Sequence, residues 1–96
     1  MAYGYDWRQT QQGTSSGTGN VQSLAPTNAS FTAALVSAES NDCRITVDGS
    51  APSATNGHIV YKGAPMQLVL LGDSNDVIKF CAATAGPAIL NVSWGY

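Results

Sequence analysis

Charged side chains are scarce in this sequence of 96 residues. They make up 10% of the chain, with four Lys and Arg against six Asp and Glu, and the net charge is −2. An average soluble domain has roughly 25% charged residues. A surface so poor in Lys and Arg offers no footprint for a phosphate backbone, so we expect no nucleic acid among the partners. Copies with so little charge repel each other weakly, which suits a protein packed beside copies of itself.

Long apolar runs are also absent. No run approaches the roughly 18 residues of a membrane span, so we expect no membrane partner. The first eight residues lack both the basic region and the apolar segment of a signal peptide, and we expect synthesis in a cytoplasm. The length fits one small domain.

Groups that commonly carry catalysis are few. His58 is the only histidine, and no feature of the sequence places it beside Cys81 or a serine, as a nucleophilic triad requires. We therefore favour a histidine on an edge strand or turn. Residues 72–76 hold the carboxylate and amide side chains of Asp73, Asn75 and Asp76 but lack the glycine and glutamate of an EF-hand loop, which favours a polar hairpin turn over a calcium site. We expect no enzyme activity, no catalytic residue, no metal site and no cofactor.

The two cysteines are predicted to stay apart. In an extended strand, side chains alternate between the two faces. Cys43 then shares an inward face with Ile45 and Val47, whereas Cys81 points outward with Lys79. We therefore favour free thiols over a disulfide, with Cys43 acting as a small buried hydrophobe.

Short apolar stretches bounded by turn residues dominate the second half of the chain. They lie at residues 43–49, 58–63, 66–72, 77–82 and 90–96. Such runs of β-branched and aromatic residues between Gly, Pro, Asn and Asp predict strands. Residues 30–37 fit either a helix or a strand, and their neighbours favour a strand. The expected fold is all-β: a small antiparallel β-sandwich of about six to seven short strands with an extended N-terminal arm.

Alternation within these strands predicts the core. The inward positions are expected to be Phe31, Leu35, Ile45, Val47, Val60, Leu68, Leu70, Ile78, Phe80, Leu90 and Val92. Trp94 continues the last strand, which favours a core or interface position over a sugar-stacking platform with Tyr61 and Tyr96. The segment 66–71 is apolar on both faces, so it is predicted to be covered on both sides. Tyr61, Val69 and Leu71, on the face opposite the core, are the predicted oligomer contacts.

The first 27 residues have a different composition. Between Arg8 and Ser23 the only aliphatic residue is Val21, too little to offset the entropy lost on ordering. We therefore divide the chain into an extended polar arm, residues 1–27, and a β-sandwich domain, residues 28–96. The alternating Tyr3, Tyr5 and Trp7 are interpreted as an anchor that binds a partner surface, or alternatively as the first strand of the domain.

A resemblance emerges from the turn and strand signatures. Residues 44–58 read as a strand ending in Asp-Gly, a Pro-bearing loop, and Asn-Gly-His opening the next strand. Lys-Gly-Ala-Pro follows at 62–65, then Ile-Lys-Phe at 78–80 and a closing Leu-Asn-Val-Ser-Trp at 90–94. Over residues 29–96 the chain resembles small virion structural proteins of tailed bacteriophages.

This resemblance implies a component of the virion. The function it favours is a capsid decoration, or cement, protein that binds the major capsid protein and stabilises the head. Such proteins commonly form dimers or trimers, so we expect a homo-oligomer. A tail, connector or fibre-base component remains an alternative, and a carbohydrate-binding module is a further one.

Overall fold

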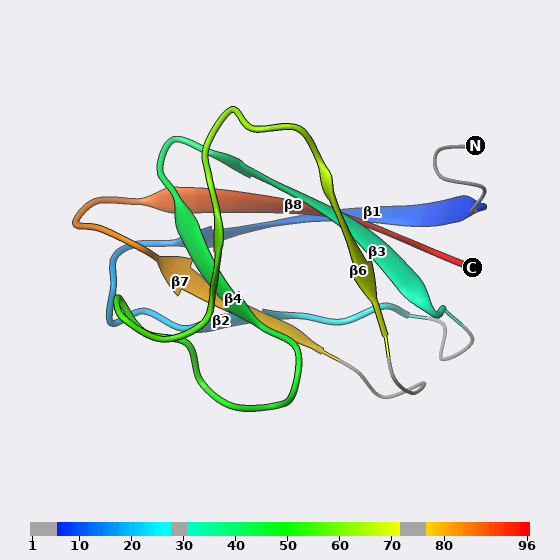
Figure 1. Ribbon diagram of the computed structural model, residues 1–96, viewed down its shortest axis with the longest axis horizontal. Coiled ribbons are helices and arrows are strands. Elements are labelled where there is room, and N and C mark those ends of the chain that lie inside the picture. The colour runs from blue at the N-terminus through cyan, green and yellow to red at the C-terminus, as the bar shows by residue number, and fades with distance from the viewer. Residues whose placement is uncertain (1–5, 28–30, 72–76) are drawn as a thin grey trace.

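The computed structural model describes residues 6–27, 31–71 and 77–96. Within these three ranges the chain forms eight β-strands (Figure 1): β1 (Trp7–Ser15), β2 (Gln22–Leu24), β3 (Ala33–Glu39), β4 (Cys43–Thr46), β5 (His58–Val60), β6 (Gln67–Leu70), β7 (Ile78–Ala82) and β8 (Ala88–Gly95). The described residues include no helix that could cross a membrane.

The strands form two four-stranded sheets packed face to face. The first sheet has the order β1-β8-β3-β6, and the second has the order β2-β7-β4-β5. Every pairing between these strands is antiparallel. The prediction of an all-β antiparallel sandwich is confirmed, as is the choice of a strand for residues 33–37. The described part of the chain has eight strands, one more than the six to seven that the sequence predicts, because the polar N-terminal segment contributes two strands.

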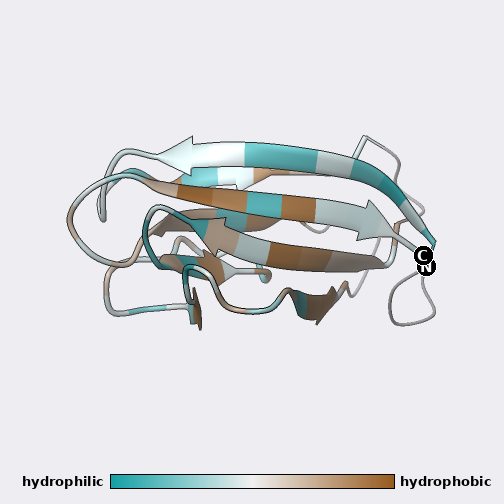
Figure 2. Cartoon of the chain, turned by 90° about the horizontal axis from the view of Figure 1, so that it is seen from above, coloured by the Kyte–Doolittle hydropathy of each residue, from teal (hydrophilic) through white to brown (hydrophobic). Residues whose placement is uncertain are grey.

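Strand β8 is the centre of the core. Its alternate residues Ala88, Leu90, Val92 and Trp94 are fully buried. They lie beside Ala34, Val36 and Ala38 of β3, all in one apolar cluster with Phe80 and Ile78 of the second sheet. In Figure 2, β8 is largely hydrophobic, whereas the neighbouring β1 is hydrophilic or neutral along its length.

Most of the predicted core is confirmed. Seven of its members lie in the buried cluster, namely Phe31, Ile45, Val60, Ile78, Phe80, Leu90 and Val92, and Val47 packs against it. Trp94 belongs to the same cluster, as expected for a core position. The Leu70 side chain lies outside the described part of the structure.

The core prediction is wrong for Leu68, and Leu35 is buried as predicted but lies on the other face of its sheet. Leu35 is buried, but it pairs with Ser93 and Leu68 on the outer face of the first sheet, and Leu68 is 38% exposed. Both β3 and β6 are apolar on both faces. Alternation alone therefore left their inward face undecided, and a one-residue change of phase exchanges the two faces.

The predicted boundary between an arm and a domain at residue 27 is also wrong for the described residues. Strand β1 pairs with β8 from Trp7 to Ser15, and β2 pairs with β7. Beyond β1, Asp6 and Tyr96 exchange two backbone hydrogen bonds. A polar segment can join a sheet in this way because main-chain hydrogen bonds need no apolar side chain.

Both cysteines are free and fully buried. The absence of a disulfide in the structure agrees with the prediction, and Cys43 lies in the core as expected. Cys81 shares a face with Arg44, its partner across β4 and β7, but the predicted exposure is wrong. Burial raises the pKa of the Cys81 thiol, and burial raises that of Cys43 to about 11.

Candidate interaction surface and loop pocket

The predicted contact residues are not on one surface. Tyr61 is 55% exposed, as a contact residue should be. Val69 and Leu71, however, pack against the core, because Val69 pairs with the buried Ala34. Both side chains therefore lie on the core side and not on the face opposite the core, and their role as oligomer contacts stays a prediction. Tyr3 and Tyr5 lie outside the described residues.

Trp7 lies on its own domain. It is half-buried and pairs with Gly95 at the end of β8. A Cβ built on Gly95 would lie 2.8 Å from Cε3 of the Trp7 ring, so the indole lies directly over that glycine. For Trp7 the structure agrees with the alternative in which this segment is the first strand.

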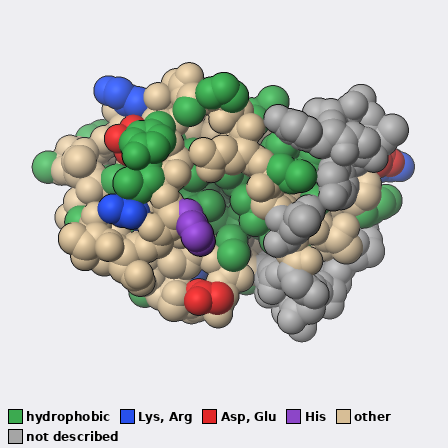
Figure 3. All heavy atoms as spheres, in the orientation of Figure 1, with side chains coloured by type: hydrophobic (Ala, Val, Ile, Leu, Met, Phe, Trp, Pro, Cys, Tyr) green, Lys and Arg blue, Asp and Glu red, His purple; other side chains and the backbone are tan. Residues whose placement is uncertain are grey.

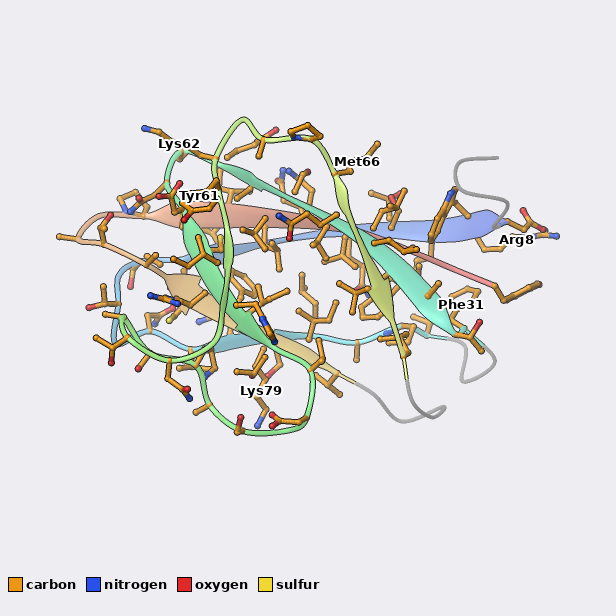
Figure 4. The ribbon with its side chains drawn as sticks, viewed as in Figure 1. Arg8, Phe31, Tyr61, Lys62, Met66 and Lys79 are labelled. Atoms are coloured by element: carbon orange, nitrogen blue, oxygen red, sulfur yellow. The ribbon has the colours of Figure 1, made fainter. Side chains whose placement is uncertain are left out.

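Three exposed apolar side chains follow one another where the chain crosses from the second sheet to the first. Tyr61 is 55% exposed, Met66 52% and Leu68 38%. We call these three residues the crossing edge. Figure 4 shows Tyr61 and Met66 on the same side of the molecule, and Figure 3 shows hydrophobic side chains exposed there. Sequence reasoning identified Tyr61 but missed Met66 and Leu68, because nothing local marks which face of β6 is exposed.

The start of the crossing segment is held in place by hydrogen bonds from its backbone amides. The Lys62 amide donates to Asp42 Oδ1 at 2.8 Å, and the Gly63 amide donates to the Ala38 carbonyl at 3.2 Å. The Ala64 amide donates to the Tyr61 carbonyl at 3.2 Å, which closes the turn. The exposure of Tyr61 is thus fixed by the fold.

Two sheet edges meet at this side of the sandwich. Strand β5 ends the second sheet and β6 ends the first, so each is paired along only one side. The unpaired main-chain groups of an edge strand are a template for pairing with another chain. Exposed apolar residues next to open edges make this the part of the described surface best suited to bind protein.

A separate pocket lies within the loop that joins β4 to β5. It has a volume of about 420 Å³ and is lined by Thr46, Val47, Asp48, Ser50, Asn56, Gly57 and His58. Hydrogen bonds from the Ser50 hydroxyl and amide hold the pKa of the Asp48 carboxyl below its ordinary value. His58 is exposed at the start of the edge strand β5, which confirms the prediction for this residue.

Two other kinds of site, a sugar-stacking platform and a metal site, have no support in the geometry of the described residues. Trp94 is fully buried, so it cannot form a sugar-stacking platform with Tyr61 and Tyr96. No three His, Cys, Asp or Glu side chains within 6–27, 31–71 and 77–96 are grouped to hold a metal ion. The polar turn at 72–76 lies outside the described residues.

Known proteins give no further guide. No family model, no curated protein and no solved structure matches this chain.

Proposed function

We propose that this protein is a structural component of a bacteriophage virion, and specifically a decoration protein that binds the major capsid protein lattice. The observation that carries the proposal is the crossing edge, where Tyr61, Met66 and Leu68 are exposed beside two open sheet edges. The resemblance of residues 29–96 to small virion proteins supplies the partner.

The chemistry of this edge suits binding between proteins. Aromatic side chains and Met are enriched at protein interfaces, and Lys, Glu and Asp are depleted. The neighbouring Lys62 lies beside Tyr61 in Figure 4, so the edge has a polar rim. Removing three partly exposed apolar side chains from water favours association by roughly 25 cal/mol per Å² of apolar area.

The proposed mechanism is differential binding. A protein that binds only the expanded shell shifts the equilibrium toward it by its difference in affinity for the two states. At a free concentration of 100 times Kd, this stabilises each site by about 2.7 kcal/mol. Many weakly charged copies on one shell repel each other little. Oligomers of this chain, dimers or trimers, would raise the avidity of attachment.

Co-sedimentation with bare capsids tests the proposal. Replacing Met66 and Leu68 with Ser should weaken binding about tenfold or more, since a few apolar residues carry most of the affinity of an interface. The control is Val21→Ser. Val21 is 38% exposed, the same fraction as Leu68, but it precedes β2 on another part of the surface. Full binding by the double variant would contradict the role of the crossing edge.

Copy number separates decoration from the alternative. A tail, connector or fibre-base component should be present in a handful of copies per particle, and a decoration protein in hundreds. Quantitative gel analysis of purified virions measures this ratio. Absence of the protein from purified virions would contradict both the decoration role and the tail, connector or fibre-base role.

A further inference from the structure

The loop of residues 47–57 is held by side-chain hydrogen bonds from both sides. On one side, Asp48 Oδ1 accepts hydrogen bonds from the Ser50 amide at 3.0 Å and hydroxyl at 2.6 Å. The Thr46 hydroxyl donates to the Ser50 carbonyl, and Lys79 Nζ donates to the Gly49 carbonyl at 3.0 Å. The turn beside Asp48 is therefore held by four side chains, those of Thr46, Asp48, Ser50 and Lys79.

Arg44 fixes the other side. Its Nη1 donates to the Gly57 carbonyl at 2.8 Å and its Nε to the Ala54 carbonyl at 3.3 Å. Gly57 has a φ of +116°, and a Cβ there would lie 2.8 Å from the Ile45 carbonyl oxygen, so only glycine fits. Two of the chain's four basic side chains, Arg44 and Lys79, thus serve to hold this one loop.

Three other polar groups in the lining differ from the Thr46 and Ser50 hydroxyls, which the turn already uses. Within the described residues, no hydrogen bond reaches Asp48 Oδ2, the Asn56 side-chain amide or the His58 imidazole. All three residues are exposed and line the same cavity of about 420 Å³. A rigid frame around unpaired donors and acceptors is the arrangement that lowers the entropy cost of binding a ligand.

We propose that this pocket binds a neutral polyhydroxylated ligand of the size of one sugar ring. Each hydroxyl both donates and accepts, so adjacent hydroxyls pair with a carboxylate, an amide and an imidazole. Val47 supplies an apolar patch for the C–H face of the ring. The volume lies within the roughly 300–1,000 Å³ of small-molecule sites.

Other ligand classes fit less well. Asp48 is the only carboxylate in the lining, whereas calcium takes six to eight oxygen ligands. An anionic ligand would meet the Asp48 carboxylate without a Lys or Arg in the lining to offset it. This inference does not depend on the decoration role, because the pocket and the crossing edge share no residue.

Chemical-shift titration of the full chain with glucose, galactose, mannose and N-acetylglucosamine tests the proposal. At sugar concentrations up to about 100 mM, at least one should give saturable shifts with a roughly millimolar Kd. We expect the shifts to be confined to residues 46–50 and 56–58. The absence of saturable shifts with all four sugars, or shifts centred elsewhere, would overturn the proposal. Shifts of these residues with Ca²⁺ alone would also overturn it.

Matched variants locate the site. Asp48→Asn keeps an oxygen that accepts from Ser50 and preserves the turn, but it removes the carboxylate charge. This change and, separately, His58→Ala should each weaken sugar binding about fivefold or more. Thr14→Ala, on an exposed position of β1, should leave the affinity unchanged. Parent affinity in both pocket variants would refute the assignment, and their spectra report at once whether they fold.

Discussion

Gln11 joins the polar first strand to the centre of the core, because its Oε1 accepts a hydrogen bond from the Trp94 indole N–H at 2.9 Å. Its Nε2 donates to the Ala25 carbonyl at 2.8 Å. One glutamine thus satisfies the polar atom of the largest buried side chain and ties β1 to the segment that follows β2. Gln9 acts similarly, since its Oε1 accepts from the Thr27 amide at 3.0 Å.

Gln11→Ala should lower the free energy of unfolding by about 1–3 kcal/mol. The change leaves the buried Trp94 N–H and the Ala25 carbonyl without their partner, and an unsatisfied buried group costs about this much. The control is Gln12→Ala, the same change at an exposed position on the opposite face, which should stay within about 0.5 kcal/mol of the parent. Urea denaturation measures both. Equal midpoints for the two variants would contradict this role of Gln11.

Gly13 should not tolerate a side chain. It faces the core from β1, and a Cβ there would lie 2.8 Å from Cζ and 3.0 Å from Cε1 of Phe80. Gly13→Ala should therefore destabilise the fold by about 1–3 kcal/mol through overpacking. Gly17→Ala is the matched control, since no heavy atom lies within 4 Å of its Cβ position. Thermal unfolding of both variants gives the comparison, and a parent-like Tm for Gly13→Ala would show that the ring moves aside freely.

The strands of the second half were predictable because they carry local signals. Apolar residues between turn residues marked β4, β7 and β8, and in these strands one face is clearly more apolar than the other. β3 and β6 are apolar on both faces, so their orientation depends on which sheet covers which side. That information lies in the tertiary structure, and for this reason Leu35 and Leu68 were assigned to the wrong face.

The polar segment shows a second limit. Residues 8–23 have a single aliphatic side chain, Val21, and composition alone predicted an arm. The fold instead pairs β1 with β8 and β2 with β7, buries Ser15 and gives Gln11 a partner in the core. The bond from Trp94 to Gln11 joins positions 83 residues apart, and no local pattern encodes such contacts. The loop pocket was likewise missed, since its Asp48 and His58 look like ordinary turn and edge residues in sequence.

Phe80→Ala should lower the free energy of unfolding by about 3–5 kcal/mol. A domain of this size is expected to unfold when it loses that much stability. Phe80 is fully buried and contacts the position of Gly13 from the opposite sheet. Leu68→Ala is the control, because a side chain that is 38% exposed leaves no closed cavity when it is truncated. Circular dichroism during heating compares the two. Similar melting of Phe80→Ala and the parent would mean that the assigned core is incorrect.

The stability of the protein should fall as the pH rises from about 9 to about 11. The pKa of the Cys43 thiol is near 9.0 in an unfolded chain and is raised to about 11 in the fold by burial. Between these values the unfolded state releases its proton and the folded state keeps it, so rising pH favours unfolding. The stability that the buried Cys43 thiol contributes is fully present below about pH 9 and is lost as the pH rises through about 11.

Cys43→Ala isolates that contribution. The two proteins differ only at residue 43, so the measured quantity is the difference in unfolding free energy between parent and variant at each pH. This difference should shrink from pH 9 to pH 11. A constant difference would show that the Cys43 thiol titrates alike in the folded and unfolded states.

Removal of residues 1–15 should abolish the fold. The deletion eliminates β1, exposes the whole edge of β8 and leaves two buried donors, Trp94 Nε1 and the Ala82 amide, without Gln11 and Ser15 as acceptors. The truncated chain retains Trp94 as its only tryptophan, so fluorescence reports on the core directly. We expect a red-shifted emission and no cooperative unfolding transition, because each uncompensated group costs about 1–3 kcal/mol in addition to the lost burial. A synthetic peptide of residues 1–15 should restore the blue-shifted emission by re-forming the β1–β8 pairing. A truncated protein that unfolds cooperatively with the parent Tm would instead establish that this segment is a dispensable arm.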